Sequence, residues 1–274
     1  MSRIAQYLKE DLGYGDITSN ALISDQTGNA NIIAKQDCVL AGVEEAREVF
    51  LLLGLSVHPL AKDGQRVVQG IEVLRIEGKM KSILAGERLA LNFLMRMSGI
   101  ATTTNDVLVA CRRRNPQVRV AATRKTTPGF RFYEKKAVVL GGGDPHRYRL
   151  DDAILIKDNH LAVVGSITEA VRLAKQASFT KKVEVEVESM ADAKEAAEAG
   201  ADIIMLDNMS PQEASACART IRAIDPRILI EASGGITPEN APSYAEAVDV
   251  ISLGWLTHSV RSADLSLEVT AIKK

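Results

Sequence analysis

The sequence predicts an α/β fold whose second half is a parallel β-sheet covered by helices. From about residue 118 onward, short apolar runs alternate with helical segments, and helices that connect successive strands give parallel pairing with right-handed crossovers. The first half, up to about residue 115, mixes strand-like runs and helices without this alternation. The chain of 274 residues is long enough to bury a sizeable core, either as one large domain or as two smaller ones.

In the first half we predict strands over residues 29–42 and 65–78, each bounded by Gly or Asp. A short amphipathic helix over 44–54 is ended by a glycine. A long helix is predicted over 84–114, because apolar residues recur there at helical spacing, and Gly99 is expected to bend or interrupt it.

In the second half, predicted strands alternate with predicted helices. Ser166, Ser210 and Thr237 are expected to be helix N-caps, because each precedes a helical segment with an acidic residue in its first turn. The strands cover residues 118–123, 153–156, 181–189, 201–206, 227–232 and 248–254, and the helices cover 166–177, 190–200, 210–224 and 237–247.

Charge and cysteine content exclude several classes of protein. The formal net charge of -1 lacks the basic excess of nucleic-acid-binding proteins. Cys38, Cys111 and Cys217 form no CxxC pair, which argues against a zinc site or a disulfide framework and favours a reducing cytoplasm. No apolar run approaches the ~20 residues of a membrane span, and the N-terminal residues lack the apolar core of a signal peptide. We therefore expect a cytoplasmic protein whose partners include neither nucleic acid nor a membrane.

The densest group of functional side chains lies between Thr123 and His160. A local cationic cluster on a nearly neutral chain indicates a small polyanionic ligand. The glycine run within it lacks the GxGxxG spacing of a dinucleotide-binding loop. The cluster comprises Arg124, Lys125, Arg131, Lys135, Lys136, His146, Arg147, Arg149, Lys157 and His160, and we expect Lys135 and Lys136 to be only surface or loop charges.

Polar or glycine residues follow nearly every strand predicted in the second half. Arg124-Lys125, Lys157, Asp207, Ser233 and Gly254 each come directly after a strand. In parallel α/β barrels the active site forms at this end of the strands, from several strand ends together. The recurrence favours a functional site over ordinary loop polarity.

Glutamates and valines alternate along residues 183–188. The period of two places Glu184, Glu186 and Glu188 on one face of the strand. On an open edge strand this face would be solvated, whereas in a barrel it would point inward, where a carboxylate needs a cation or a metal. We expect at least one of these glutamates to meet the cations of other strand ends, or Mg²⁺ together with Asp207.

Ser233-Gly234-Gly235 precedes a predicted helix, and Gly254 follows the next strand. Glycines let backbone N–H groups approach an anion, so this pairing indicates a phosphate site. Arg88, on the long helix, has the pattern of an ordinary solvated charge.

Several motifs in register closely resemble the quinolinate phosphoribosyltransferase family, also called carboxylating nicotinate-nucleotide pyrophosphorylases. The central matches are TRKTTPG, EKKAVVLGGGDPHRYRL and ILIKDNH. EDLGYGDIT, GERLALNFL with SGIAT, VEVEVES, IMLDN, ASGGI and ISLGWLTHS flank them in the family's order, so the resemblance spans essentially the whole chain. Asp144-Pro145 departs from the Asn expected before the His-Arg pair, and Trp255 stands where a small residue is usual.

The resemblance implies an N-terminal α/β sandwich with an interdomain helix over residues 1–110, followed by a partly open parallel α/β barrel over residues 111–259. The tail 260–274 is expected to pack back on the first domain. It also implies a homodimer or hexamer and an Mg²⁺-dependent reaction of de novo NAD biosynthesis. In that reaction quinolinate and phosphoribosyl pyrophosphate give nicotinate mononucleotide, pyrophosphate and carbon dioxide.

The resemblance also assigns roles to individual residues. Lys157 is the candidate to meet the leaving carboxylate or the carbanion, and Lys125 would contact pyrophosphate. Glu186 and Asp207 would face the ribose and the metal. The quinolinate pocket would consist of Arg124, His146, Arg147 and Lys157 with Arg88 of the partner subunit, and the 5-phosphate would lie against Ser233, Gly234, Gly235 and Gly254, near His258.

Three other functions are compatible with parts of this pattern. A related phosphoribosyltransferase with another acceptor, such as nicotinate or that of a molybdenum-transport-associated paralogue, would share the phosphate motifs. A Schiff-base barrel aldolase would use Lys157 as its nucleophile. A non-catalytic sugar-phosphate sensor would keep the glycine motif but would not need Lys157, Glu186 and Asp207 together.

Overall fold

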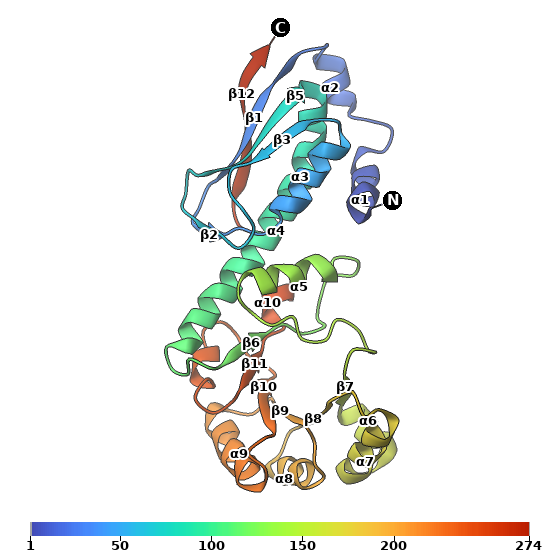
Figure 1. Cartoon of the computed structure of the whole chain (residues 1–274), viewed down its shortest axis with the longest axis vertical. Helices are drawn as coiled ribbons and strands as arrows, with labels where there is room; N and C mark the ends of the chain where they lie inside the picture. Colours follow the sequence, from blue (N-terminus) through green and yellow to red (C-terminus); the bar gives the residue numbers. More distant parts are fainter. Residues whose placement is uncertain (1, 274) are drawn as a thin grey trace. The chain divides into compact units, whose positions relative to one another are not determined.

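The computed structural model describes residues 2–273 and divides into two compact units (Figure 1). The first unit comprises Met1–Thr102 and Val260–Lys274, and the second comprises Thr103–Ser259. This division falls inside a long helix, whereas the boundary expected from the sequence is at residue 110.

The first unit is built on a four-stranded antiparallel sheet in the order β12-β1-β5-β3. Helix α3 packs against β3 and β5, and α1 packs against α3. A separate two-stranded ribbon pairs β2 with β4. The elements are α1 Arg3–Leu12, α2 Ile17–Leu22, β1 Thr27–Ala34, β2 Cys38–Val39, α3 Val43–Leu52, β3 Ser56–Pro59, β4 Arg66–Val67, β5 Glu72–Lys79 and β12 Leu265–Lys273.

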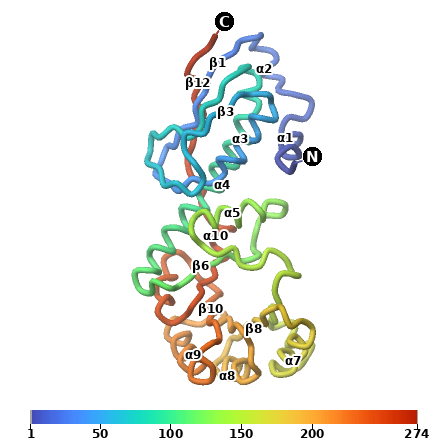
Figure 2. Tube along the Cα trace, in the orientation of Figure 1, coloured from blue at the N-terminus to red at the C-terminus, as the bar shows by residue number. Residues whose placement is uncertain are grey.

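Strand β12 supplies one edge of this sheet although it follows β5 by almost two hundred residues of sequence. Its pairing with β1 runs from Thr27 opposite Lys273 to Ala34 opposite Leu265. Figure 2 shows the two segments side by side, coloured from opposite ends of the sequence. The first unit is therefore made of two separate parts of the chain.

Helix α4 (Met80–Arg112) runs without interruption through Gly99, so the expected break there is wrong. A Cβ atom on Gly99 would lie 2.2 Å from the carbonyl oxygen of Arg261 and 2.9 Å from the Cα of Ser262. The glycine is required by the close approach of the returning chain. Although α4 has 33 residues, neither it nor any other helix in the described chain has the apolar length of a membrane span.

The second unit is built on a six-stranded, wholly parallel sheet in the order β6-β11-β10-β9-β8-β7. The end strands β6 and β7 do not pair with each other in the described residues, so the barrel is open, as expected. Figure 1 shows α7, α8 and α9 on the outer side of the sheet. The strands are β6 Arg119–Ala121, β7 Ile154–Ile156, β8 Val183–Val187, β9 Ile203–Asp207, β10 Leu229–Ser233 and β11 Val250–Ser252, and the helices are α5 Arg131–Leu140, α6 Asp158–Val164, α7 Ile167–Ala177, α8 Met190–Glu198, α9 Pro211–Ile224 and α10 Trp255–His258.

The predicted N-caps are confirmed at two of three positions. The hydroxyl of Ser166 accepts from the N–H of Glu169, and Ser210 forms a reciprocal capping box with Glu213. The helix expected from Thr237 is wrong, since only a 3-10 turn forms, at Ala241–Ser243. Pro242 has no N–H for a helical bond, and its ring excludes a regular helix through the preceding turn.

Helices α5 and α6 were not predicted. The buried face of α5 contains the charged residues Glu134 and Lys135 beside Tyr133, Ala137 and Val138, so it lacks a continuous apolar stripe. Helix α6 has no buried residue, so it too lacks that stripe.

Candidate active site

A cavity of about 380 Å³ opens at the carboxyl ends of the parallel strands in the second unit. Most of the site residues predicted from the sequence line it. Gly234, Gly235, Gly254 and His258 follow β10 and β11 but do not line the cavity, and Arg88 belongs to the first unit, where it is exposed on α4. The charged or hydroxyl-bearing residues around the cavity are Thr123, Arg124, Lys125, His146, Arg147, Lys157, Glu186, Asp207, Glu231, Ser233 and Ser252.

The parallel register aligns the side chains that line the cavity. Glu186 on β8 pairs with Met205 on β9, and Met205 pairs with Glu231 on β10. Two residues further along, Asp207 pairs with Ser233. Paired residues point to the same face of a sheet, and so do residues two apart, so both rows face the cavity.

One side of the cavity contains an ion pair between adjacent strand ends. The ammonium of Lys157, which follows β7, donates a hydrogen bond to the carboxylate of Glu186. The backbone N–H of Lys157 donates to Nδ1 of His160 (2.9 Å), which fixes the start of α6. Burial raises the pKa of Asp207, and the nearby Glu186 raises it further. Lys157, Glu186 and Asp207 therefore form a connected series of charges.

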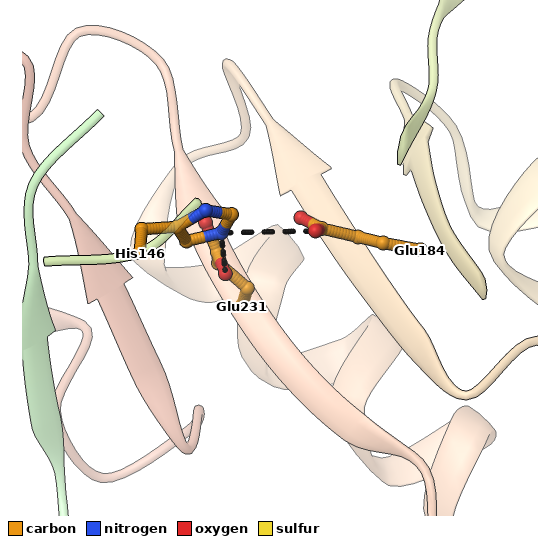
Figure 3. A group of neighbouring side chains, drawn as sticks. All are labelled: His146, Glu184 and Glu231. Carbon is orange, nitrogen blue, oxygen red and sulfur yellow. Dashed lines mark ion pairs between the residues drawn. The ribbon is translucent and has the colours of Figure 1, made fainter. Parts of the chain in front are cut away.

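A second cluster lies on the same face, where the imidazole of His146 meets two carboxylates (Figure 3). Nε2 of His146 is 3.7 Å from Oε2 of Glu184 on β8 and 3.4 Å from Oε2 of Glu231 on β10. Both carboxyl side chains are almost fully buried, at 2% and 3% exposure. The expectation that an inward-facing glutamate meets a cation is met at Glu184 and Glu186. Glu231 was missed, although a single charge within a buried strand was a signal of it.

The proton on Nε2 of His146 decides what this cluster can bind. Burial acts to lower the pKa of His146, but the hydrogen bonds and charges of the two glutamates outweigh it and raise the pKa to about 10. Nδ1 accepts a hydrogen bond from the N–H of Arg147 (2.8 Å), which opposes a proton there. Nε2 carries a proton whether the ring is neutral or charged. The three side chains are spaced like metal ligands, but Nε2 already lies within ion-pair distance of both carboxylates, so the cluster is balanced without an ion and we assign no metal to it.

Both ring nitrogens of His146 thus have protein partners, although the side chain lines the cavity. Burial raises the pKa of Glu184, and the charge of Glu231 acts in the same direction. Oε1 of each glutamate has no hydrogen-bond partner in the described chain. The cluster fixes the ring of His146 rather than presenting a free nitrogen to a ligand.

Two guanidinium groups occupy the same end of the cavity. Nη1 of Arg147 donates to the carbonyl of Ala153 at 3.3 Å. Burial lowers the pKa of Arg147, and the charge of Arg124 lowers it further. Nε of Arg124 is buried and has no hydrogen-bond partner among the described residues. Two neighbouring cations with an unused donor are suited to an anion with more than one negative charge.

The loop that carries His146 begins at Asp144. One carboxylate oxygen of Asp144 accepts from the N–H of His146 (2.8 Å), and the other pairs with the guanidinium of Arg119. An Asn at this position would keep the first interaction and lose the charge of the second. Trp255, the other departure from the family pattern, packs partly buried against the core of this unit.

The glycines after β10 surround an asparagine with left-handed backbone conformation. Asn208 (φ 54°) donates its N–H to the carbonyl of Ser233 (3.1 Å) and its Nδ2 to Oδ2 of Asp207 (2.6 Å). A Cβ atom on Gly234 would lie 2.4 Å from Oδ1 of Asn208, so a side chain there would displace the residue that orients Asp207.

Gly254 is needed because its missing side chain leaves room for its neighbours, and not because of an unusual backbone conformation. A Cβ atom there would lie 2.9 Å from Cδ of Lys125 and 3.1 Å from Nε2 of His258. The hydroxyl of Thr257 donates to the carbonyl of Lys125 at 2.6 Å. The glycine therefore lets Lys125 and His258 lie close together beside the end of β11.

The expectation that Lys135 is a surface or loop charge is wrong. Its side chain is fully buried on α5, whereas the neighbouring Lys136 is partly buried. The preceding residue, Glu134, is also fully buried and accepts from the N–H of Thr127 (2.9 Å) and from its hydroxyl (3.1 Å). Helix α5 therefore supports the segment after Arg124-Lys125.

Two models of one protein family together match most of the chain. The model for the N-terminal domain of quinolinate phosphoribosyl transferase matches residues 16–98, and that for its C-terminal domain matches residues 100–268.

Named relatives and solved structures give the same result. The chain is 48% identical to a probable carboxylating nicotinate-nucleotide pyrophosphorylase of Methanothermobacter thermautotrophicus, over the whole of both chains. It is 41% identical to the human carboxylating nicotinate-nucleotide pyrophosphorylase, over 98% of this chain and 91% of the relative. The crystal structure of NadC from Streptococcus pyogenes is similar with a TM-score of 0.90 and 42% identity, over 98% of this chain and 96% of that one.

Gly234 and Gly235 provide a matched test of the Asn208 arrangement. Both have left-handed φ angles, 81° and 61°, but a Cβ on Gly235 would meet nothing within 4 Å. Gly235→Ala should cost about 1–2 kcal/mol of unfolding free energy, for backbone conformation alone. Gly234→Ala should cost about 1–3 kcal/mol more, because of the clash with Asn208. Urea unfolding of both variants measures the difference, and equal losses would contradict the assignment of the close contact.

Proposed function

This chain belongs to the quinolinate phosphoribosyltransferase family, and we propose that it transfers the phosphoribosyl group of phosphoribosyl pyrophosphate to quinolinate with loss of carbon dioxide. The products are nicotinate mononucleotide, pyrophosphate and carbon dioxide, and the reaction supplies de novo NAD biosynthesis as a decarboxylating pentosyltransferase. The observation that carries the proposal is one cavity lined both by two neighbouring arginines and by the Lys157–Glu186 pair beside Asp207.

Arg124 and Arg147 line the proposed dicarboxylate pocket. Quinolinate carries two carboxylates on adjacent ring carbons, and guanidinium groups bind carboxylates through two parallel hydrogen bonds. Arg124 and Arg147 repel each other in the free protein, as the lowered pKa of Arg147 indicates. A bound dianion relieves this repulsion. His146 contributes by its fixed position beside Arg147 rather than by a free ring nitrogen.

Glu186 and Asp207 line the proposed phosphoribosyl site. When pyrophosphate leaves, the ribose carbon develops positive charge, and Glu186 and Asp207 are placed to stabilise it. Lys125, beside Gly254, would offset charge on the departing pyrophosphate. Ser233, Gly234 and Gly235 with Gly254 and His258 would bind the 5-phosphate through backbone N–H groups and hydroxyls.

Glu186 and Asp207 also fit an Mg²⁺ ion. Magnesium is usually held by one or two carboxylates together with substrate phosphates, rather than by a complete protein cage. The raised pKa of Asp207, due to burial and to Glu186, shows that these carboxyl groups lie close enough to repel. Bound Mg²⁺ would neutralise charge on pyrophosphate as it leaves.

Decarboxylation follows attack by the ring nitrogen of quinolinate on the ribose carbon. The resulting pyridinium stabilises negative charge at the adjacent carbon, from which carbon dioxide is lost. We assign Lys157 the role of meeting this carboxylate and the carbanion it leaves, which takes up one proton from the Lys157 ammonium or from water to give the product. The side chain of Lys157 lines the cavity and is 42% exposed while its ammonium pairs with Glu186, so it is accessible to a ligand bound there.

The three alternative functions are less well supported. A nicotinate-specific enzyme needs only one carboxylate site, whereas two arginines and Lys157 line this cavity. An aldolase lysine must be uncharged to attack a carbonyl, whereas Lys157 forms an ion pair. A sensor would not need Lys157, Glu186 and Asp207 in one connected series.

Incubation with quinolinate, phosphoribosyl pyrophosphate and Mg²⁺ tests the central proposal. We expect nicotinate mononucleotide and carbon dioxide in equal amounts, measured by chromatography and by release of labelled carbon dioxide. Chelation of the metal should suppress the reaction, and nicotinate should not replace quinolinate. Absence of nicotinate mononucleotide with Mg²⁺ present would refute the proposal, and turnover of nicotinate would favour the alternative acceptor.

The role of Lys157 is tested by Lys157→Ala. We expect kcat to fall by roughly 10²-fold or more, the range found for removal of a group that acts on the reacting atoms. Lys182→Ala, at an exposed position, is the control. Steady-state kinetics measures both variants, and undiminished turnover would remove Lys157 from the mechanism. Trapping of a substrate adduct on the wild-type enzyme by borohydride would favour the aldolase instead.

We also propose that the protein is a cytoplasmic enzyme that assembles as a homodimer or as a hexamer built from three dimers. The three cysteines are buried and unpaired, which suits a reducing compartment. Arg88 is exposed on α4, so it is accessible to a neighbouring subunit. In this proposal Arg88 of the partner subunit completes the dicarboxylate pocket.

Mixed dimers test the contribution of Arg88 across subunits. Arg88→Ala and Lys157→Ala should each be nearly inactive alone. Because a mixed dimer contains one site with neither defect, random mixing should restore about a quarter of wild-type activity if each chain supplies its arginine to the other. Coexpression and activity measurement decide this, and no recovery in confirmed mixed dimers would place Arg88 in its own subunit's site or outside it.

A further inference from the structure

We propose that Lys135 is a positioning residue, whose buried ammonium holds the backbone of residues 145–147 and thereby aims Arg147 at the dicarboxylate. The inference rests on the proposed function of the cavity. It adds to the site a residue that does not line the cavity itself. Lys135 lies on α5, whereas the segment it holds follows the glycine turn Gly141–Gly143.

The contacts of Lys135 bracket one strained residue. Its Nζ donates to the carbonyl oxygen of Pro145 and to that of Arg147 (2.7 Å), the two neighbours of His146. His146 has a φ of 51°, in the left-handed region that is strained for a non-glycine residue. A strained residue persists only where its surroundings hold it. The two bonds from Lys135 are such a restraint, because they hold the peptide group that precedes His146 and the one that follows Arg147.

Other residues hold the N–H of His146 and the residues that follow Arg147. Asp144 accepts from the N–H of His146, and Asp152 accepts from the N–H groups of Tyr148 (2.7 Å) and Arg149 (2.9 Å). Nη1 of Arg131 donates to the carbonyl of Tyr148 at 2.9 Å. These contacts leave the carbonyls of Pro145 and Arg147 to Lys135, so its loss would release the middle of the segment and not its ends.

A lysine is an expensive choice at this position unless its donors are needed. The side chain is fully buried, and its hydrogen bonds go to carbonyls rather than to a carboxylate. Burial lowers the pKa of Lys135 to about 8, and the charge of Arg131 contributes. The ring of Tyr148, 5.2 Å from Nζ, offsets only part of this cost. An apolar side chain of similar length would fill the space without desolvating a charge. A lysine here is therefore better explained by its hydrogen bonds to the two carbonyls than by a gain in stability.

Lys135→Met tests the inference, because methionine keeps the length and removes the donors. We expect the KM for quinolinate to rise at least tenfold, while the KM for phosphoribosyl pyrophosphate stays within about twofold. A purely structural role would lower the thermal midpoint or the active fraction and leave both KM values unchanged. Lys182→Met, at an exposed position, is the matched control and should leave both KM values unchanged.

The outcomes separate this inference from the proposed function. If the wild-type enzyme does not convert quinolinate, the proposed function fails whatever Lys135 does. If the wild type is active and Lys135→Met retains the wild-type KM for quinolinate, the inference is overturned. If Lys135→Met does not fold, Lys135→Arg, which keeps a cation and its donors but changes their geometry, should raise the KM for quinolinate threefold or more. An unchanged value for that variant would also overturn the inference.

Discussion

The register of the six parallel strands is the constraint on which the rest of the cavity depends. It sets Glu186, Met205 and Glu231 in one row across three strands, and Asp207 and Ser233 in the next. Because the side-chain period of a strand is two, a shift of one residue in any strand would turn its polar groups into the apolar layer beneath the helices. The valines of β8 are buried on the opposite face, so the core and the cavity enforce the same register.

Charge balance on this face is achieved between strands and loops rather than within any one element. Lys157 and Glu186 come from neighbouring strand ends, and His146 is brought by a loop to glutamates on β8 and β10. Helix α5 contributes buried charged residues that bind two loops. Its consecutive buried charges, Glu134 and Lys135, each bind a loop that carries arginine, one through Thr127 and the other through two carbonyls. The arginines that line the cavity are thus positioned by charges that do not line it.

Much of this arrangement could be predicted from the sequence, because it depends on local and periodic signals. The alternating strand at 183–187, the N-caps at Ser166 and Ser210 and the polar strand ends are all visible in short windows. The parts that could not be predicted depend on contacts between distant residues. The need for Gly99 is set by backbone more than 160 residues away, and the burial of Lys135 depends on a loop whose carbonyls turn inward.

The roles of the glycines and of His146 in the site also depend on contacts between distant residues, so the sequence alone could not predict them. Gly234 and Gly254 look alike in the sequence, but one accommodates Asn208 and the other accommodates Lys125 and His258. His146 was expected in the quinolinate pocket, and the fold pairs both of its ring nitrogens with groups of the protein. Which atoms of a side chain remain available is decided by the tertiary contacts and not by the motif.

The pairing of β1 with β12 has a consequence for the order of events during synthesis. The ribosome makes β1 (Thr27–Ala34) long before residues 265–273 exist, and all of Thr103–Ser259 emerges between them. The parallel sheet can therefore complete its hydrogen bonding while β1 still has an open edge facing the solvent. Such an edge is a template for unwanted pairing with other chains, so the first unit must wait, with this strand exposed, until its final partner leaves the exit tunnel.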